Sequence, residues 1–181
     1  ITSELTELAL ANSIVEVDVS AGTTEKFSSF HSYGIDSVVF NFASHKSAKL
    51  APLAKSASGG ELSRVMLAIE VVIASKFPVG TYIFDEVDAG VGGKAAIEVG
   101  RRLKELSKIA QVIVVTHLPQ VAAWGDEHFV VSKDESGSVS LSEVRKLGKS
   151  ERVEEIARML AGHEDSAAAR KHAEELLAES L

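Results

Sequence analysis

Two adjacent carboxylates, Asp85 and Glu86, come directly after the apolar run Tyr82-Ile83-Phe84. A short apolar run between turn residues predicts a buried strand, so both acids would stand at its carboxyl end. Mg²⁺ prefers oxygen ligands and takes one or two carboxylates while it keeps several waters. The pair therefore suits a site in which Asp85 holds a metal ion and Glu86 acts as a general base on a water. Taken alone, the two residues are equally compatible with a solvated acidic turn.

A second group, Ser58-Gly59-Gly60-Glu61, stands where a segment with helical spacing begins. Ser58 as the N-cap, with Glu61 three residues later, is the pattern of a capping box, which needs no function. The paired glycines would also expose backbone N–H groups at the positive end of a helix, where phosphate oxygens bind well. The two interpretations are compatible with each other.

A third group, Thr116-His117, ends the apolar run 112–115. A lone histidine is more often structural than functional. The order strand, helix, strand over residues 81–115 predicts a parallel sheet with helices on its faces. In such a sheet His117 would lie beside Asp85 and Glu86 at the edge where α/β proteins bind ligands.

The turn from Gly90 to Ala95 fits the G-x-G-x-x-A dinucleotide fingerprint between a strand and a helix. However, the acids just before it, Asp85, Glu86 and Asp88, would repel a pyrophosphate. It also fails as a phosphate loop, since Asp88 stands six residues before Lys94 where a glycine is required, and Ala95 replaces the metal-binding Ser or Thr. We interpret it as a glycine turn at a helix start.

The remaining pattern predicts further elements around these groups. Alternating apolar residues predict strands around 15–19 and 38–42, and helical spacing predicts helices from 58 and over 92–108. Other predicted elements are the end of a helix over 3–12, a loop over 43–57, a short helix over 118–124, a hairpin of 129–133 with 139–144, a helix from an N-cap at Ser150 to Leu160, and a last helix over about 165–177.

Composition narrows the class of protein. The 181 residues suffice for one domain or one lobe of a larger one, and the net charge of −7 argues against a strongly basic, free-standing nucleic-acid binder. A local basic patch remains open, for example Arg101, Arg102, Lys104 and Lys108, which could equally be a solvated helix face. The chain has no cysteine, which fits a reducing cytoplasm, and no apolar run of membrane-spanning length. Because the sequence starts without Met or a signal peptide, we expect a piece of a longer protein.

Together, the groups resemble the motifs of an ABC-type ATPase head, in order and in spacing. Residues 58–61 resemble the signature motif, 82–86 the Walker B strand, 87–90 the D-loop, and 114–117 the strand of the switch histidine. The sequence is very similar to the RecN family of bacterial DNA-repair ATPases in four segments: 53–68, 84–93, 115–123 and 151–160. The match covers roughly residues 35–165.

The resemblance implies an α/β fold: the C-terminal lobe of an ABC/SMC-type ATPase head, with a parallel sheet flanked by helices. Residues 1–12 would be the foot of a coiled coil, and 13–181 would be the lobe. A separate N-terminal lobe, absent from these 181 residues, would carry the phosphate loop. The resemblance further implies that the full protein hydrolyses ATP and acts in DNA double-strand-break repair and recombination. It would act in the cytoplasm of a bacterium, at the nucleoid.

The resemblance also implies a role for each site residue. Ser58, Gly59 and Gly60, with Glu61 completing the motif, would contact the ATP held by a second, identical head. Asp85 would help to hold Mg²⁺, Glu86 would activate water, and His117 would contact the γ-phosphate. Asp88 would cross the interface between the heads. The partners implied are the N-terminal lobe, the second head and double-stranded or broken DNA, without a membrane.

The missing phosphate loop leads us to expect that these residues alone bind ATP weakly and hydrolyse almost none. Two alternatives stay open. One is the head lobe of another SMC-like or transporter ATPase, and the other is a non-catalytic dimerisation module that keeps the motifs as a scaffold.

Overall fold

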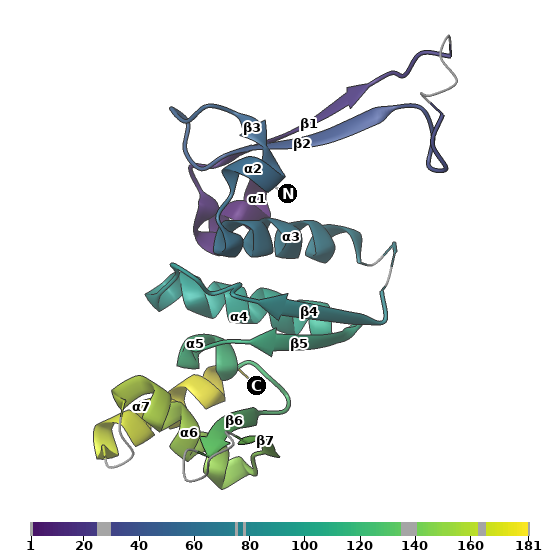
Figure 1. Cartoon of the computed structure of the whole chain (residues 1–181). Coiled ribbons are helices and arrows are strands. Elements are labelled where there is room, and N and C mark those ends of the chain that lie inside the picture. Colours follow the sequence, from purple (N-terminus) through teal and green to yellow (C-terminus); the bar gives the residue numbers. More distant parts are fainter. Residues whose placement is uncertain are drawn as a thin grey trace.

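The computed structural model describes residues 2–24, 30–74, 76–77, 79–134, 141–162 and 166–180. Its layers are stacked along one direction, from a projecting hairpin to a helical pair at the other end (Figure 1). The elements are α1 (Thr2–Leu5), η1 (Thr6–Leu10, a π-helical turn), β1 (Ile14–Ser20), β2 (Ser37–Ala43), β3 (Ala51–Pro52), α2 (Leu53–Ser56), α3 (Gly59–Ile73), β4 (Thr81–Asp85), α4 (Gly93–Ser107), β5 (Gln111–Val115), α5 (Pro119–Ala122), β6 (Phe129–Asp134), β7 (Leu141–Lys146), α6 (Lys149–Ala161) and α7 (Ala167–Glu179).

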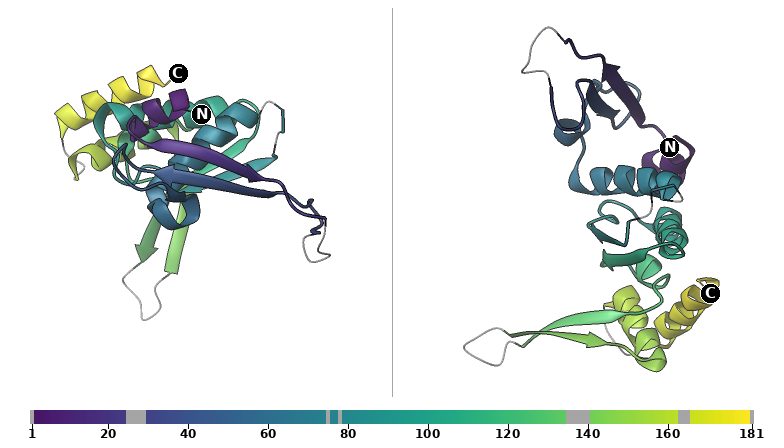
Figure 2. Two further views of the ribbon diagram at one scale, coloured as in Figure 1. Left: turned by 90° about the horizontal axis from the view of Figure 1, so that it is seen from above. Right: turned by 90° about the vertical axis from the view of Figure 1, so that its right-hand side faces the viewer.

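The two strands predicted from alternating apolar residues are β1 and β2, and they pair as a hairpin at one end. Their antiparallel register pairs Val17 with Phe40 and Val19 with Val38, which places the apolar side chains on one face. Phe42, at the base of the hairpin, is fully buried, whereas the outer part projects away from the body (Figure 2). The predicted loop over 43–57 contains two short elements, β3 and α2.

The central layer confirms the predicted parallel sheet. Strands β4 and β5 pair in parallel, with Ile83 beside Ile113 and Asp85 beside Val115. Helices α3 and α4 pack together beside this sheet, and the apolar residues at helical spacing on α4 are buried: Ala96, Val99, Leu103 and Leu106. These side chains join Val65, Leu67 and Phe84 in the main hydrophobic core. The helix of the glycine pair and the strand of the paired acids are therefore fixed to one core.

The C-terminal part packs around a second, smaller core between α6 and α7, which includes Ile156, Ala157, Ala173 and Leu176. The predicted hairpin is confirmed as β6 and β7, although its expected turn at 135–137 lies outside the described residues. The prediction that Ser150 caps the next helix is wrong. Gly148 is the N-cap, because the Glu151 carboxylate accepts a hydrogen bond from its N–H, and Ser150 lies within the first turn. The last helix begins at Ala167, after an N-cap at Ser166, rather than near 165.

At the amino end, the predicted helix end is present as α1 and η1. Arg102 of α4 donates to Glu4 of α1 at 2.5 Å, and both side chains are largely buried, so this segment is tied to the central layer. A coiled coil beyond it stays a prediction. Among the described residues, the helices are too short or too polar to cross a bilayer.

Candidate functional site

The carboxyl ends of β4 and β5 bring the predicted chemical groups together. The parallel register sets Asp85 beside Val115, so Glu86 and the Thr116-His117 pair continue from adjacent strands at the same edge. Asp85 is exposed, and its backbone carbonyl accepts a hydrogen bond of 3.1 Å from the Ser63 hydroxyl of α3. The side chains expected to hold a metal, activate water and contact phosphate therefore start from one edge.

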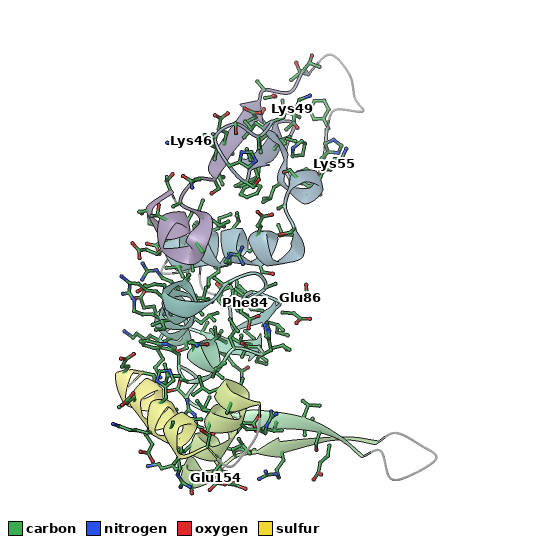
Figure 3. The ribbon with its side chains drawn as sticks, turned by 90° about the vertical axis from the view of Figure 1, so that its left-hand side faces the viewer. Lys46, Lys49, Lys55, Phe84, Glu86 and Glu154 are labelled. Atoms are coloured by element: carbon green, nitrogen blue, oxygen red, sulfur yellow. The ribbon has the colours of Figure 1, made fainter. Side chains whose placement is uncertain are left out.

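Glu86 has an unusual backbone. Its φ of 56° lies in the left-handed region, which costs a residue with a side chain of the order of 1 kcal/mol or more. Its Oε2 lies 3.1 Å from the position that a Cβ on Gly59 would occupy, so the carboxylate approaches the first glycine of α3. Figure 3 shows Glu86 at the side of the molecule, beyond the buried Phe84. Such strain is concentrated at functional sites in other proteins.

Asp88 is almost completely buried, with 1% of its surface exposed. Its Oδ2 accepts hydrogen bonds from the Thr116 hydroxyl and from the His117 N–H, the latter at 3.2 Å, and lies 3.4 Å from His117 Nδ1. The His117 side chain itself is 76% exposed. Asp88 is thus engaged within its own chain, and its expected contact across a head interface stays a prediction.

The start of α3 confirms the predicted capping box. Ser58 N–H and Ser58 Oγ each lie 2.8 Å from Glu61 Oε2, and the Glu61 N–H donates to Ser58 Oγ at 3.4 Å. Gly60 lies against the turn after β4, since a Cβ on it would be 2.8 Å from both the Cβ and the carbonyl oxygen of Ala89. Close packing on the turn therefore requires glycine at position 60.

Arg64 is the residue of this region whose role the sequence did not reveal. It is buried, and its Nη1 donates to the Ala89 carbonyl oxygen at 2.7 Å. Burial lowers the pKa of its guanidinium, and the charge of Glu61 partly opposes that change. The available signal was its spacing, because Arg64 lies one helical turn after Gly60 and so shares its face.

This edge offers few protein ligands for a divalent cation. Among the described residues, no group of three or more His, Cys, Asp or Glu side chains is arranged to hold a metal ion. Asp85 is exposed and makes no ion pair with another described residue. One free carboxylate fits Mg²⁺, which commonly takes one or two carboxylates together with substrate phosphates.

The glycine turn is a turn at a helix start, as interpreted. Gly90 and Gly93 have φ values of 72° and 53°, and α4 begins at Gly93 after an N-cap at Gly92. The left-handed conformations explain the glycines without a ligand.

The basic patch considered on α4 is largely neutralised. Arg101 pairs with Glu98 at 2.7 Å, Arg102 with Glu4, and Lys104 with Asp126 at 2.5 Å. A different segment is basic and unpaired in the described structure: Lys46, Lys49 and Lys55 are exposed, and no acid occurs between Ser37 and Gly60 (Figure 3).

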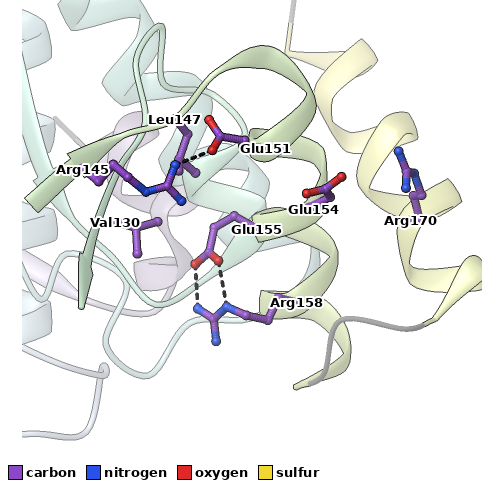
Figure 4. Close-up of a pocket in the computed structure, with 8 residues that line it drawn as sticks. All are labelled: Val130, Arg145, Leu147, Glu151, Glu154, Glu155, Arg158 and Arg170. Carbon is purple, nitrogen blue, oxygen red and sulfur yellow. Dashed lines mark hydrogen bonds and ion pairs between the residues drawn. The ribbon is translucent and has the colours of Figure 1, made fainter. Parts of the chain in front are cut away.

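A cavity of about 370 Å³ lies away from this edge, between β6, β7, α6 and α7. Figure 4 shows two ion pairs among the residues that line it, Arg145 with Glu151 and Arg158 with Glu155. The Gly148 N–H and then Arg145 lower the pKa of Glu151. None of the predicted site residues lines this cavity.

No protein-family model matches the sequence. Curated proteins do: the chain is 62% identical over 144 residues to "DNA repair protein RecN" of Streptomyces coelicolor, covering 80% of this chain and 25% of that protein. It is 47% identical over 192 residues to the protein of the same name from Mycobacterium tuberculosis, strain CDC 1551, covering 98% and 32%. The Deinococcus radiodurans protein of that name is 49% identical over 146 residues, covering 81% and 25%.

Solved structures with a similar fold are SMC heads. The Smc head of Pyrococcus yayanosii, with a coiled coil and joint, superposes with a TM-score of 0.58 at 20% identity, over 96% of this chain and 28% of that one. The Smc head of Pyrococcus furiosus bound to the C-terminal domain of ScpA gives 0.57 at 22% identity, over 83% and 34%. A chain from work on ATP-driven dimerization and DNA-stimulated activation of SMC ATPases gives 0.50 at 22%, over 87% and 88%.

The chain thus spans about a quarter to a third of the length of these curated relatives. At those identities the chain belongs to the RecN family, and its fold is that of SMC head domains.

Proposed function

We propose that these residues form the C-terminal lobe of a RecN-type ATPase head that acts in DNA double-strand-break repair and recombination. The observation that carries this proposal is the edge where Asp85, Glu86 and His117 meet, directly beside the Gly59-Gly60 start of α3. Glu86 would accept a proton from the attacking water, and His117 would donate a hydrogen bond to the γ-phosphate. Asp85 would hold Mg²⁺, which would neutralise charge on the phosphate oxygens.

Two further partners complete the proposed site. Ser58 and the N–H groups of Gly59 and Gly60 would contact the ATP held by a second head, because a helix start favours anions. In this way ATP would join two heads, and hydrolysis would release them. The curated relatives are named as DNA repair proteins, and one SMC neighbour is described as activated by DNA, which supports DNA as the larger partner.

An N-terminal lobe with the phosphate loop is the remaining partner. The outer face of the β4–β5 sheet supports it, because Ile83, Ile113 and Val115 are 71%, 45% and 58% exposed. An open groove of about 310 Å³ adjoins this face, and Ile83 lines it together with Leu62 and Met66 of α3. Parallel sheets are normally covered on both faces, and two parallel strands make a marginal sheet. We therefore assign this face to the part of the longer protein that carries the phosphate loop.

The test uses the full-length protein with Glu86→Gln, which keeps the shape of the side chain and removes the base. ATP binding should persist while turnover falls by about 10²–10⁴-fold, the usual contribution of a general base. Turnover is measured with and without double-stranded DNA, which should change the rate of the unmodified protein. Normal turnover of the Gln variant would contradict the role of Glu86.

The alternatives predict other outcomes. A full-length protein that binds DNA but never hydrolyses ATP would favour a non-catalytic dimerisation module. The head of a transporter is disfavoured by the 44–62% identity to proteins named for DNA repair.

A further inference from the structure

Asp88 is a buried carboxylate with an unusual set of partners. A buried charge is costly unless donors surround it. The described hydrogen bonds to the Asp88 carboxylate come from two consecutive residues that follow β5. Its Oδ2 accepts from the Thr116 hydroxyl and the His117 N–H and lies 3.4 Å from His117 Nδ1. One oxygen thus accepts a hydrogen bond from the His117 backbone and lies close to its ring.

The turn that carries Asp88 is itself held from the opposite side. Arg64 donates to the Ala89 carbonyl at 2.7 Å, and Gly60 packs closely on Ala89. Val87, just before Asp88, is fully buried in the main core. The residues 87–89 therefore lie clamped between α3 and the end of β5.

We propose that Asp88 is a positioning residue that fixes Thr116 and His117 from within the same lobe. The inference rests on the proposed function, since it acts on the contact between His117 and the γ-phosphate. An imidazole that is 76% exposed would otherwise rotate freely. The hydrogen bond from the His117 N–H to Asp88 fixes the backbone, and the same oxygen, 3.4 Å from Nδ1, would favour one orientation of the ring. A displacement of about 1 Å at a reacting group can cost about 10²-fold in rate.

The first part of the test changes the donor rather than the acid. In the full-length protein, Thr116→Val removes the hydroxyl with little change of shape, and Thr116→Ser retains it. We expect the Val variant to lower kcat for ATP hydrolysis at least ~10-fold with KM within about twofold, and Ser to restore most of the rate. The matched control is Thr81→Val, which removes a 3.1 Å hydrogen bond to Gln111 between the same strands at their other end. This control should retain the normal rate.

The second part asks whether Asp88 acts through His117. Single-turnover hydrolysis is measured for Asp88→Asn, His117→Ala and the double variant. If Asp88 acts by positioning His117, the Asn substitution adds less than about twofold to the effect of His117→Ala, because the coupled effects are not additive. If the rate of the double variant is reduced by the product of the two single reductions, the proposal is overturned and Asp88 has only a general structural role.

The outcomes are separable from the proposed function. If the unmodified protein does not hydrolyse ATP, the proposed function fails and this inference falls with it. If it does hydrolyse ATP, but Thr116→Val matches the control, or lowers kcat and raises KM together without rescue by Ser, the positioning role alone is wrong. Should the variants of His117 be too slow to compare, the contrast between Val and Ser at Thr116 decides the question.

Discussion

The carboxyl edge and the outer face of the β4–β5 sheet differ in whether the groups at each find partners within the described chain. At the carboxyl edge of β4 and β5, two buried polar groups are paired within the chain: the Asp88 carboxylate with Thr116 and His117, and the Ala89 carbonyl with Arg64. On the outer face of the same strands, Ile83, Ile113 and Val115 stand in solvent. Buried polar groups need partners wherever they are, and apolar groups need cover.

The difference separates what this lobe does alone from what it leaves to a partner. At the edge, a hydrogen bond within the same chain holds the backbone of His117, one of the candidate catalytic residues. On the outer face, apolar side chains are exposed in the described structure. Burying them would stabilise the protein by about 25 cal/mol for each Å² of apolar surface removed from water. We infer that the lobe is pre-organised for chemistry but incomplete as a folded layer.

Of the three changes that test this comparison, the one with the largest expected effect alters the packing at the carboxyl edge. Gly60→Ala places a Cβ 2.8 Å from Ala89, a contact with backbone that can be relieved only by moving α3 away from the turn. We expect ATP turnover of the full-length protein to fall by up to about 10²-fold, since the turn carries Asp88. The rate is measured beside Gly80→Ala, where nothing lies within 4 Å of an added Cβ. Equal rates for the two variants would show that the packing of α3 on the turn is unimportant.

The next prediction sharpens the role of the outer face. If another part of the protein covers it, Ile83→Ser should lower the free energy of unfolding of the full-length protein by about 1–2 kcal/mol, because a buried aliphatic side chain is lost. Urea denaturation measures this change. Val131→Ser, at an equally exposed position of β6, is the comparison and should cost less than about 0.5 kcal/mol. A similar small change at Ile83 would mean that the face stays open.

The smallest expected effect is on the pH dependence of stability, and it involves His128, which belongs to neither the carboxyl edge nor the outer face. Burial, and secondarily the charge of Arg152, lowers the pKa of His128 below its usual range. The unfolded chain then binds more protons than the folded one, so stability is greatest above the unfolded pKa of about 6.5 and decreases as the pH falls through it. Unfolding measured at about pH 8 and pH 6 should show this loss, and His128→Gln should reduce it. An unchanged pH dependence in the Gln variant would assign the loss to other groups.

Sequence patterns predicted the elements that depend on local spacing. The stripe on α4 and the parallel pair β4–β5 follow from apolar periodicity, and this pairing alone brings Asp85, Glu86 and His117 to one edge. The capping box at Ser58 and Glu61 was equally readable, because its partners are three residues apart.

Tertiary contacts account for what the sequence did not reveal. Asp88 meets Thr116 and His117 across 28 and 29 residues, and Arg64 meets Ala89 across 25, so no local pattern reports these bonds. The helical spacing of Leu62, Met66 and Val72 on α3 resembles a buried face, yet these side chains are exposed. Periodicity shows that a face is apolar, but not whether its cover belongs to the same stretch of chain.

The most direct measurement is ATP turnover by these 181 residues, alone and mixed with the rest of the full-length protein, each with and without double-stranded DNA. The account predicts no turnover above background for this lobe alone, turnover once the missing part is supplied, and a change in rate with DNA. Hydrolysis by the lobe alone would contradict the claim that its edge is half of a site, and it would return attention to the glycine turn between Gly90 and Lys94.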